Sequence, residues 1–254
     1  MRRVQHRMQQ IYIKSYSDYI SYIQAHPEEF VPLFNTIEIN FTSFFRDASA
    51  WEYIATEILP LIIANKSLNE GIRVWSAGCA SGEEVYTLAI ILAETLGLDV
   101  MRSRVKIFAT DVDSDALNKA RLATYTASEV VGIPPTLLKR YFQRVDNSYV
   151  FRQDLRHVFV FANRNLVQDA PMSLIDLLVC RNVLIYLNVE AQIKVLVRFH
   201  FGLKQSGFLF LGQAENADVY TKIFTSVNLK HHVFSKVPGA QREPYLLPQA
   251  FLTQ

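Results

Sequence analysis

A glycine-flanked loop follows the first strand candidate of the chain. Gly78 and Gly82 enclose it directly after the apolar run 72–77. Glycines at such positions let a backbone turn tightly and approach a ligand closely. The loop lacks the Gly-x-Gly-x-x-Gly pattern of dinucleotide sites and the Gly-Lys-Ser/Thr ending that holds a triphosphate. Taken alone, a loop of this kind is as often an ordinary turn as a binding site.

An acidic residue one strand later makes the binding interpretation sharper. Asp111 ends the apolar run 105–110, and an acid at that place in a doubly wound sheet can accept hydrogen bonds from both ribose hydroxyls. An acidic residue that can bind ribose, next to a loop that lacks a phosphate-binding motif, favours S-adenosylmethionine over a dinucleotide as the ligand. Asp113 is the alternative ribose ligand, although its position just before 114–116 suits a helix N-cap.

Two glutamates open the helix that follows the glycine loop. With Ser81 as N-cap, Glu84 stands at N3 and completes a Ser-x-x-Glu capping box, so we expect Glu84 to be structural. Glu83 at N2 is then free to face a ligand. We therefore place Glu83 in the site, beside the loop that starts at Gly78.

Polar residues also follow two later apolar runs. Arg181 and Asn182 come directly after 176–180, where the carboxyl edge of a sheet is expected, and side chains there are more often functional than structural. Asn165 follows the run 158–162, where an ordinary turn residue is the alternative. Tyr186 lies four residues beyond Asn182, with core packing as its alternative.

The elements that position these residues alternate between strands and helices from residue 72 onward. Strands are expected at 72–77, 105–110, 158–162, 174–180 and 207–212, and helices at 85–96, 114–123 and 187–203. Such alternation predicts a doubly wound α/β domain whose parallel sheet is covered on both faces. Short helices are expected over 1–45 and one helix over 49–65. The run 229–237 predicts a last strand, and 238–254 a tail.

Composition excludes several classes of protein. Half of the 254 residues are apolar and 20% are charged, which predicts a large core, and a net charge of +2 offers no simple argument for nucleic-acid binding. The longest apolar run, 58–64, is far shorter than the roughly 20 residues of a membrane span. Two cysteines cannot form a disulfide framework, so a reducing cytosol is expected, and the six histidines show no metal-ligand spacing with them.

Six segments taken together resemble a known family, the CheR-type methyltransferases of bacterial chemotaxis. They are NTIEINFTSFFRD (35–47), RVWSAGCASGEEVYTLA (73–89), FATDVDSDALNKAR (108–121), NRNLVQDAP (163–171), DLLVCRNVLIYLN (176–188) and GFLFLGQAEN (207–216). The segments LLVCRNVLIY and RFHFGL especially resemble the form of this domain found in large CheB–CheR fusion and sensor proteins. The resemblance implies a Rossmann-like S-adenosylmethionine-dependent methyltransferase sheet with a short N-terminal helical subdomain and a small β insertion.

The resemblance also implies the domain boundaries and the cofactor contacts. It implies a helical subdomain over 1–48, a methyltransferase domain over 49–237 with its insertion at about 141–161, and a tail over 238–254. The segment 40–46 reads by spacing alone equally well as a capped helix start, but the family places cofactor contacts there. The residues that match its S-adenosylmethionine contacts are Asn40, Thr42, Arg46, Glu83, Asp111, Asn165, Leu166, Arg181 and Asn182.

Two departures from the family pattern affect docking of a protein substrate. The helical N-terminus is shorter than usual, and the insertion has no glycine-rich loop between its strands. The basic run Lys139–Arg164 is nevertheless expected to form a docking surface for an acidic partner, with a solvated hairpin face as the alternative. Its basic residues are Lys139, Arg140, Arg144, Arg152, Arg156 and Arg164.

The implied reaction moves the sulfonium methyl group to glutamate carboxylates of a chemoreceptor cytoplasmic domain or a similar glutamate-rich helical protein. Such a carboxylate is already ionised near neutral pH, with a pKa of about 4.3, so no general base is needed. Arg46 is expected to hold a carboxylate, preferably that of the cofactor, and Tyr186 to orient the acceptor. A non-catalytic module that binds S-adenosylmethionine or S-adenosylhomocysteine is the alternative, and a small-molecule methyltransferase a weaker one. The usual strand order of such sheets also implies that Cys79 and Cys180 lie close together.

Overall fold

The computed structural model describes residues 2–30, 32–33, 42–67, 69–215 and 223–237. Contacts between Cα atoms divide the chain into two compact units, 1–41 and 42–254, and each unit is described by itself. The first unit contains, among its described residues, the helices α1 (Arg2–Gln10) and α2 (Tyr16–Ala25) and the short 3₁₀ helix η1 (Pro27–Glu29).

A buried glutamate holds the elements of the first unit together. Both carboxylate oxygens of Glu29 accept hydrogen bonds from the guanidinium of Arg7, at 2.7 and 2.8 Å, and the hydroxyl of Tyr19 donates to Oε1 at 2.9 Å. The hydrogen bonds from Arg7 lower the pKa of Glu29 in spite of its burial. The side chain of Ser15 caps α2 by accepting from the backbone N–H of Asp18. This unit is thus held by an ion pair as well as by apolar contacts.

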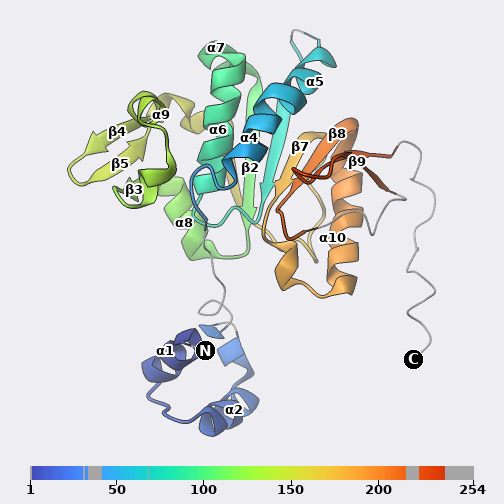
Figure 1. The fold of residues 1–254 in the computed structure, drawn as a ribbon. Coiled ribbons are helices and arrows are strands. Elements are labelled where there is room, and N and C mark those ends of the chain that lie inside the picture. The colour runs from blue at the N-terminus through green and yellow to red at the C-terminus, as the bar shows by residue number, and fades with distance from the viewer. Residues whose placement is uncertain (1, 31, 34–41, 68, 216–222, 238–254) are drawn as a thin grey trace. The chain divides into compact units, whose positions relative to one another are not determined.

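The second unit is built on a seven-stranded sheet (Figure 1). From one edge to the other the strands are β6 (Phe159–Asn163), β2 (Val105–Asp111), β1 (Ile72–Ala77), β7 (Ile175–Cys180), β8 (Leu203–Leu211), β10 (Val233–Lys236) and β9 (Phe224–Asn228). The first five run parallel, and β10 is antiparallel to both of its neighbours. The sheet is therefore mixed, although the expected α/β class is confirmed.

Helices cover both faces of the sheet. The described helices of this unit are α4 (Ala48–Tyr53), the π-helical turn η2 (Ile54–Ile58), α5 (Leu59–Ala64), α6 (Glu83–Leu96), α7 (Leu98–Arg104), α8 (Ser114–Leu122), η3 (Glu129–Gly132), α9 (Pro135–Tyr141), η4 (Gln153–Val158), η5 (Leu184–Tyr186) and α10 (Val189–Gly202). Of these, η3 and α9 contact the small three-stranded sheet described below. One apolar core joins α6 and the α4–α5 run to Val74 and Leu177, and the other joins α10 to Trp75 and Leu178. Because neighbouring residues of one strand serve opposite cores, apolar residues on both faces of the central strands β1 and β7 are buried.

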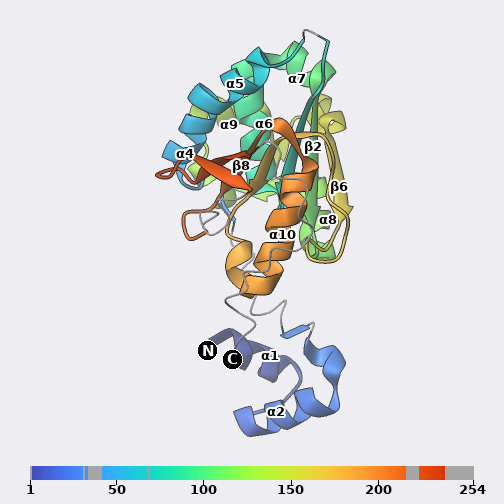
Figure 2. The ribbon, with the colours of Figure 1, turned by 90° about the vertical axis from the view of Figure 1, so that its right-hand side faces the viewer.

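Three local expectations need correction. The helix expected at 49–65 forms one run (Figure 2), but its middle turn, η2, is π-helical. The strand expected at 229–237 shortens to β10 because His232 has a left-handed φ of 53° and 229–232 form a turn. That turn closes a hairpin with β9, a five-residue strand that was not expected.

The insertion is a three-stranded antiparallel sheet and not a pair of strands. Its order is β3 (Thr124–Thr126), β5 (Ser148–Phe151) and β4 (Phe142–Val145), so it recruits a strand from outside 141–161. Tyr125 of β3 makes edge-to-face contacts with the rings of Phe44 and Phe142. A strand of only three residues, such as β3, is too short to show an alternating apolar pattern in the sequence. Aromatic packing in the folded chain stabilises its pairing with β5.

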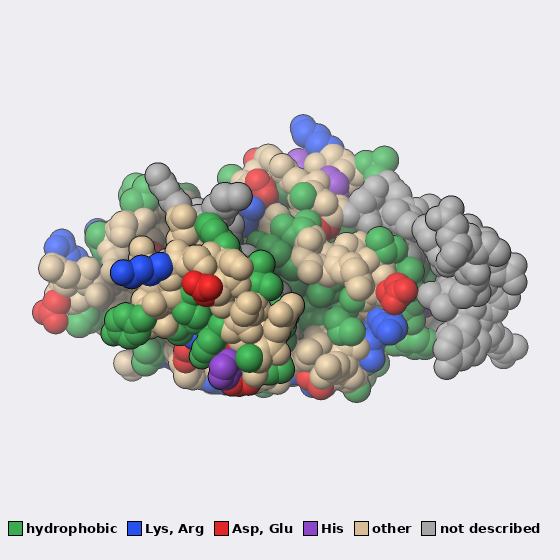
Figure 3. All heavy atoms as spheres, turned by 90° about the horizontal axis from the view of Figure 1, so that it is seen from below, with side chains coloured by type: hydrophobic (Ala, Val, Ile, Leu, Met, Phe, Trp, Pro, Cys, Tyr) green, Lys and Arg blue, Asp and Glu red, His purple; other side chains and the backbone are tan. Residues whose placement is uncertain are grey.

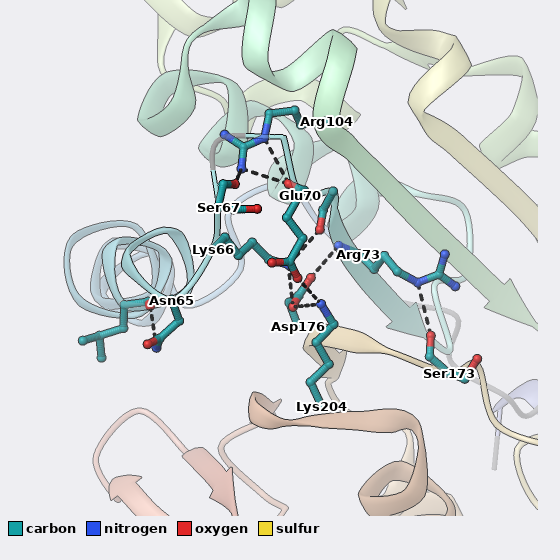
Figure 4. Close-up of polar contacts among 11 residues, drawn as sticks. Asn65, Lys66, Ser67, Glu70, Arg73, Arg104, Ser173, Asp176 and Lys204 are labelled. Atoms are coloured by element: carbon teal, nitrogen blue, oxygen red, sulfur yellow. Dashed lines mark hydrogen bonds and ion pairs between the residues drawn. The ribbon is translucent and has the colours of Figure 1, made fainter.

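An ion-pair network closes the amino edge of the large sheet (Figure 4). Lys66 and Lys204 both contact the carboxylates of Glu70 and Asp176, with N–O distances of 2.6 to 3.3 Å. Asp176 also accepts the backbone N–H of Arg73 at 2.8 Å. This network lies where the parallel strands begin, so the loops that carry the candidate site are at the other end of the sheet.

Candidate functional site

The loops that follow β1, β2, β7 and β8 meet at the carboxyl edge of the sheet. The backbone N–H of Gly78 donates to the carbonyl oxygen of Thr110 at 2.7 Å, and that of Ala80 donates to Oδ2 of Asp111 at 2.8 Å. The backbone N–H of Asn182 donates to the carboxylate of Glu215 at 2.8 Å. Ligands of open α/β sheets bind outside this edge, so we take it as the candidate site.

The glycine loop requires its glycines for geometric reasons. Gly78 has φ +76°, and a Cβ built there would lie 2.3 Å from Cγ2 of Val183 in the loop after β7. Gly82 has φ +96°, and its Cβ would lie 2.9 Å from both Cβ of Ala120 and the hydroxyl of Tyr125. Both glycines therefore combine a left-handed backbone with a close neighbour. These neighbours belong to the protein itself, so the close approaches are equally compatible with the ordinary-turn alternative.

Asp111 organises the loop next to which it was expected to bind ribose. One carboxylate oxygen accepts from Ala80 and the other from the backbone N–H of Asp113, at 2.8 and 2.9 Å. Burial raises its pKa. The backbone N–H of Val112 also acts on this carboxylate. An ionised carboxylate has about four acceptor positions, so acceptor capacity remains for a ligand. Asp113 caps α8 by accepting from Asp115 and Ala116, which confirms the capping interpretation.

The capping box expected at Ser81 and Glu84 is wrong. The N-cap of α6 is Gly82, and the hydroxyl of Ser81 donates to Oε2 of Glu83 at 2.7 Å. Glu84 instead points under the loop and accepts from the hydroxyl of Ser76 in β1 at 2.7 Å. The reason is tertiary: the start of α6 is buried against the sheet. Glu84 is structural, as expected, but through β1.

Burial strongly affects both glutamates. Burial raises the pKa of Glu84 to about 7, against the opposing charge of Arg181 and the hydrogen bond from Ser76. Burial also raises the pKa of Glu83, which is 4% exposed. Glu83 thus stands at the start of α6 with one oxygen engaged by Ser81. Glu84 forms the polar floor between the loop and the sheet.

The guanidinium of Arg181 is committed to protein groups. It forms an ion pair with Asp47 and donates to the carbonyl oxygen of Arg46 at 3.1 Å. It also lies 5.3 Å from the ring of Trp51 and 4.9 Å from that of Phe210. Arg181 therefore positions the 46–47 segment, and only its buried Nε has no hydrogen-bond partner among the described residues.

Asn182 has an unusual backbone and an unpaired oxygen. Its φ is +60°, a conformation that asparagine tolerates better than most residues. Its Oδ1 atom is buried and has no hydrogen-bond partner in the described part of the chain. Buried polar atoms are nearly always paired. The orphan oxygen therefore marks a place where a ligand donor fits.

Glu215 is a site residue that the sequence interpretation missed. Its carboxylate, 4% exposed, accepts four backbone N–H groups, from Asn182, Val183, Leu184 and Gly212, at 2.6 to 2.8 Å. It lies in the matching segment 207–216, but no spacing rule connects it to Asn182. Only the parallel pairing of β7 with β8 brings the two together.

The remaining residues of the expected site lie at its rim. Asn165 accepts the backbone N–H groups of Val167 and Gln168 through its side chain, which is a turn role, and Leu166 packs on the α10 core. Tyr186 in η5 is 45% exposed. Thr42 and Arg46 are half-buried, and the charge of Arg46 reaches Glu84. Asn40 lies outside the described residues.

Cys79 and Cys180 are both free and buried at this edge. The register pairs Ser76 with Val179, so Cys180 lies one step beyond that pair and Cys79 three. Burial raises the pKa of both thiols, and the charges of Asp111 and Glu84 act on both. Their expected proximity agrees with this register.

The described residues contain neither a metal-binding cluster nor a membrane-spanning helix. No group of three or more His, Cys, Asp or Glu side chains could hold a metal ion there. No helix in the same part of the chain has the length and apolar character of a membrane span.

Comparisons with known proteins give matches over most of the chain. The family model described as "CheR methyltransferase, SAM binding domain" matches residues 40–233, and "CheR methyltransferase, all-alpha domain" matches residues 1–37. A chemotaxis protein methyltransferase of Escherichia coli is 33% identical over 231 residues, covering 88% of this chain and 78% of that protein.

An uncharacterized 104.1 kDa protein of Rhodobacter capsulatus is 32% identical over 240 residues, which is 94% of this chain. The chain spans only a quarter of that relative's length. Among solved structures, a TehB-like SAM-dependent methyltransferase from Corynebacterium glutamicum aligns with a TM-score of 0.40 and 15% identity, covering 75% of this chain and 96% of that one.

Proposed function

Because the chain belongs to the CheR methyltransferase family, we propose that it transfers the methyl group of S-adenosylmethionine to glutamate side chains of a chemoreceptor-like protein. The product on the acceptor is a glutamyl methyl ester. The observation that carries the proposal is the match to the family's SAM-binding domain over residues 40–233, together with the carboxyl-edge site built around Gly78, Asp111 and Asn182. Relatives named chemotaxis protein methyltransferases support the choice of acceptor.

The residues of the site fit this cofactor. Asp111 keeps acceptor positions for ribose hydroxyls, and the glycine loop allows close approach of a nucleoside. The orphan Oδ1 of Asn182 suits an N–H or ammonium donor, both of which the cofactor has. Glu83 supplies a further buried carboxylate beside the loop. The bound cofactor would supply an electrophilic methyl group.

The protein's task in this reaction is positioning. An ionised acceptor carboxylate needs no general base, and the described part of the site offers no His–Asp or Cys–His pair to act as one. Alignment of the carboxylate oxygen, methyl carbon and sulfur can contribute up to about 7–11 kcal/mol to lowering the barrier. Arg46 is the candidate for holding the carboxylate of the cofactor, and Tyr186 is the candidate for orienting the acceptor.

The expected basic docking surface is weakened by the structure. Arg140 pairs with Glu94, Arg152 pairs with Asp154, and Asp154 also binds Arg102. In Figure 3, basic and acidic side chains lie next to one another and do not gather into one patch. Paired exposed charges project little net field. We therefore propose that receptor docking relies less on this segment than its sequence suggests.

The family assignment also bears on the cellular compartment of the protein and on its place within a larger chain. We propose that the protein works in the cytosol, where the two buried thiols of Cys79 and Cys180 stay reduced. The long relative of Rhodobacter capsulatus supports the proposal that such a domain can work as a module within a larger fusion protein.

Transfer of radiolabelled methyl groups tests the proposed reaction. The chain is incubated with labelled S-adenosylmethionine and receptor cytoplasmic fragments, beside matched fragments whose methylation-site glutamates are replaced by glutamine. Label that is released by base and absent from the glutamine fragments supports the proposal. Binding of S-adenosylhomocysteine without transfer to any acceptor would support the non-catalytic signalling module instead.

A further inference from the structure

We propose that Glu215 is the positioning residue of the cofactor site, because its carboxylate holds the 182–184 turn in the conformation that presents Asn182. Four backbone N–H groups converge on it. Oε1 accepts from Val183 and Leu184 at 2.6 Å each, and Oε2 accepts from Asn182 and Gly212 at 2.8 Å each. Bonds of this length to an ionised acceptor are charge-assisted and roughly twice as strong as neutral ones.

The backbone dipoles are the main compensation for this buried charge. The ion pairs found among the described residues do not include Glu215. Successive N–H groups of a turn that contains a left-handed residue form an anion-binding concavity, and the turn at Asn182 has this form. Here a side chain of the same protein fills the concavity. The turn and the carboxylate therefore depend on one another.

The surroundings fix the carboxylate in place. Gly212 must be glycine, because a Cβ there would lie 2.8 Å from the backbone nitrogen of Asn182 and 2.9 Å from Oε2 of Glu215. The carbonyl oxygen of Glu215 accepts a hydrogen bond from Nδ1 of His232 at 2.7 Å. The end of β8 and the turn before β10 thus hold Glu215 against the end of β7.

The consequence for the site follows through two neighbours of the turn. Asn182 carries the buried orphan Oδ1, and its left-handed backbone costs energy that the hydrogen bond from its N–H offsets. Val183 packs against the bare face of Gly78 in the glycine loop. Loss of the carboxylate would release the turn, withdraw the amide and loosen the contact between the two loops.

Calorimetric binding of S-adenosylhomocysteine tests the inference. We expect Glu215→Gln to weaken binding at least 10-fold, because the new amide group turns N–H donors toward N–H donors. Glu215→Asp keeps the charge and should lie between the variant and the wild type. The matched control is Asp176→Asn, an equally buried carboxylate in the amino-edge network. It should lower the melting temperature and change affinity less than 2-fold.

A double-mutant cycle separates positioning from general stability. Asn182→Gly removes the amide while allowing φ +60°, so Glu215→Gln should cost clearly less affinity in that background than in the wild type. Wild-type affinity in Glu215→Gln, or equal losses in both backgrounds, would overturn the inference. If Glu215→Gln does not fold, Glu215→Asp is used in the same cycle. The inference rests on cofactor binding and not on the acceptor, so a failure to methylate glutamate would leave it standing.

Discussion

Substitution of Gly78 by alanine tests the contact between the glycine loop and the loop after β7. The new Cβ would lie 2.3 Å from Cγ2 of Val183, whereas carbon atoms pack at about 3.5–4.0 Å. Relieving such overlap costs about 1–3 kcal/mol, and a left-handed alanine costs about 1–2 kcal/mol more. We expect Gly78→Ala to lower the free energy of unfolding by about 2–5 kcal/mol.

Two further variants separate the contact from the backbone strain. Gly97→Ala introduces no clash, since a Cβ there would meet nothing within 4 Å. Gly97 has φ +82° and ψ 153°, a conformation nearly restricted to glycine, so this variant reports backbone strain alone, at about 1–3 kcal/mol. Val183→Ala removes the atoms that clash, so the double variant Gly78→Ala/Val183→Ala should be less destabilised than the sum of the single variants, by about 1–3 kcal/mol. Urea unfolding followed by tryptophan fluorescence measures all four free energies. Additive effects of Gly78→Ala and Val183→Ala would refute the close approach of the two loops.

Three other predictions concern charged groups. Asp111→Ala should weaken S-adenosylhomocysteine binding by at least about 1.5 kcal/mol, and unchanged affinity of the folded variant in calorimetry would remove Asp111 from the site. Burial raises the pKa of Glu84 from an ordinary 4.5 to about 7, so the folded protein keeps this proton to higher pH than the unfolded chain and stability falls as pH rises from 4.5 to 7. Glu84→Gln should abolish up to about 3 kcal/mol of this fall. Parallel pH profiles of the variant and the wild type in urea unfolding would contradict the prediction. Hydrogen bonds from Lys204 and Lys66 lower the pKa of Glu70 to about 2. The stabilising contribution of Glu70 is therefore present above pH 4.5 and is lost as pH falls toward 2. Glu70→Gln should flatten this part of the acid-unfolding curve, and an unaltered curve would show that the network contributes nothing.

The sequence predicted local features correctly where the residues that cause them are close together along the chain. The run 72–77 is long, apolar and bounded by glycines, and it is β1 residue for residue. Asp113 caps α8 because an N-cap needs only the two N–H groups that follow it. The doubly wound class followed from the alternation of such runs, and the glycine loop and Asp111 were found because strand ends predict where ligands bind.

Tertiary structure decided every feature whose partner is far away along the chain. Glu84 accepts a hydrogen bond from Ser76 and not from Ser81, because α6 is buried on the sheet. Arg181 forms an ion pair with Asp47, because the segments that carry them meet at the carboxyl edge of the sheet. Arg140 of the insertion pairs with Glu94, 46 residues away, and Asp154 pairs with Arg102 of α7, 52 residues away. Glu215 reaches the turn at Asn182 only through the pairing of β7 with β8. A side chain's hydrogen-bond partner is set by distance in space, and the sequence specifies that distance only through the complete fold.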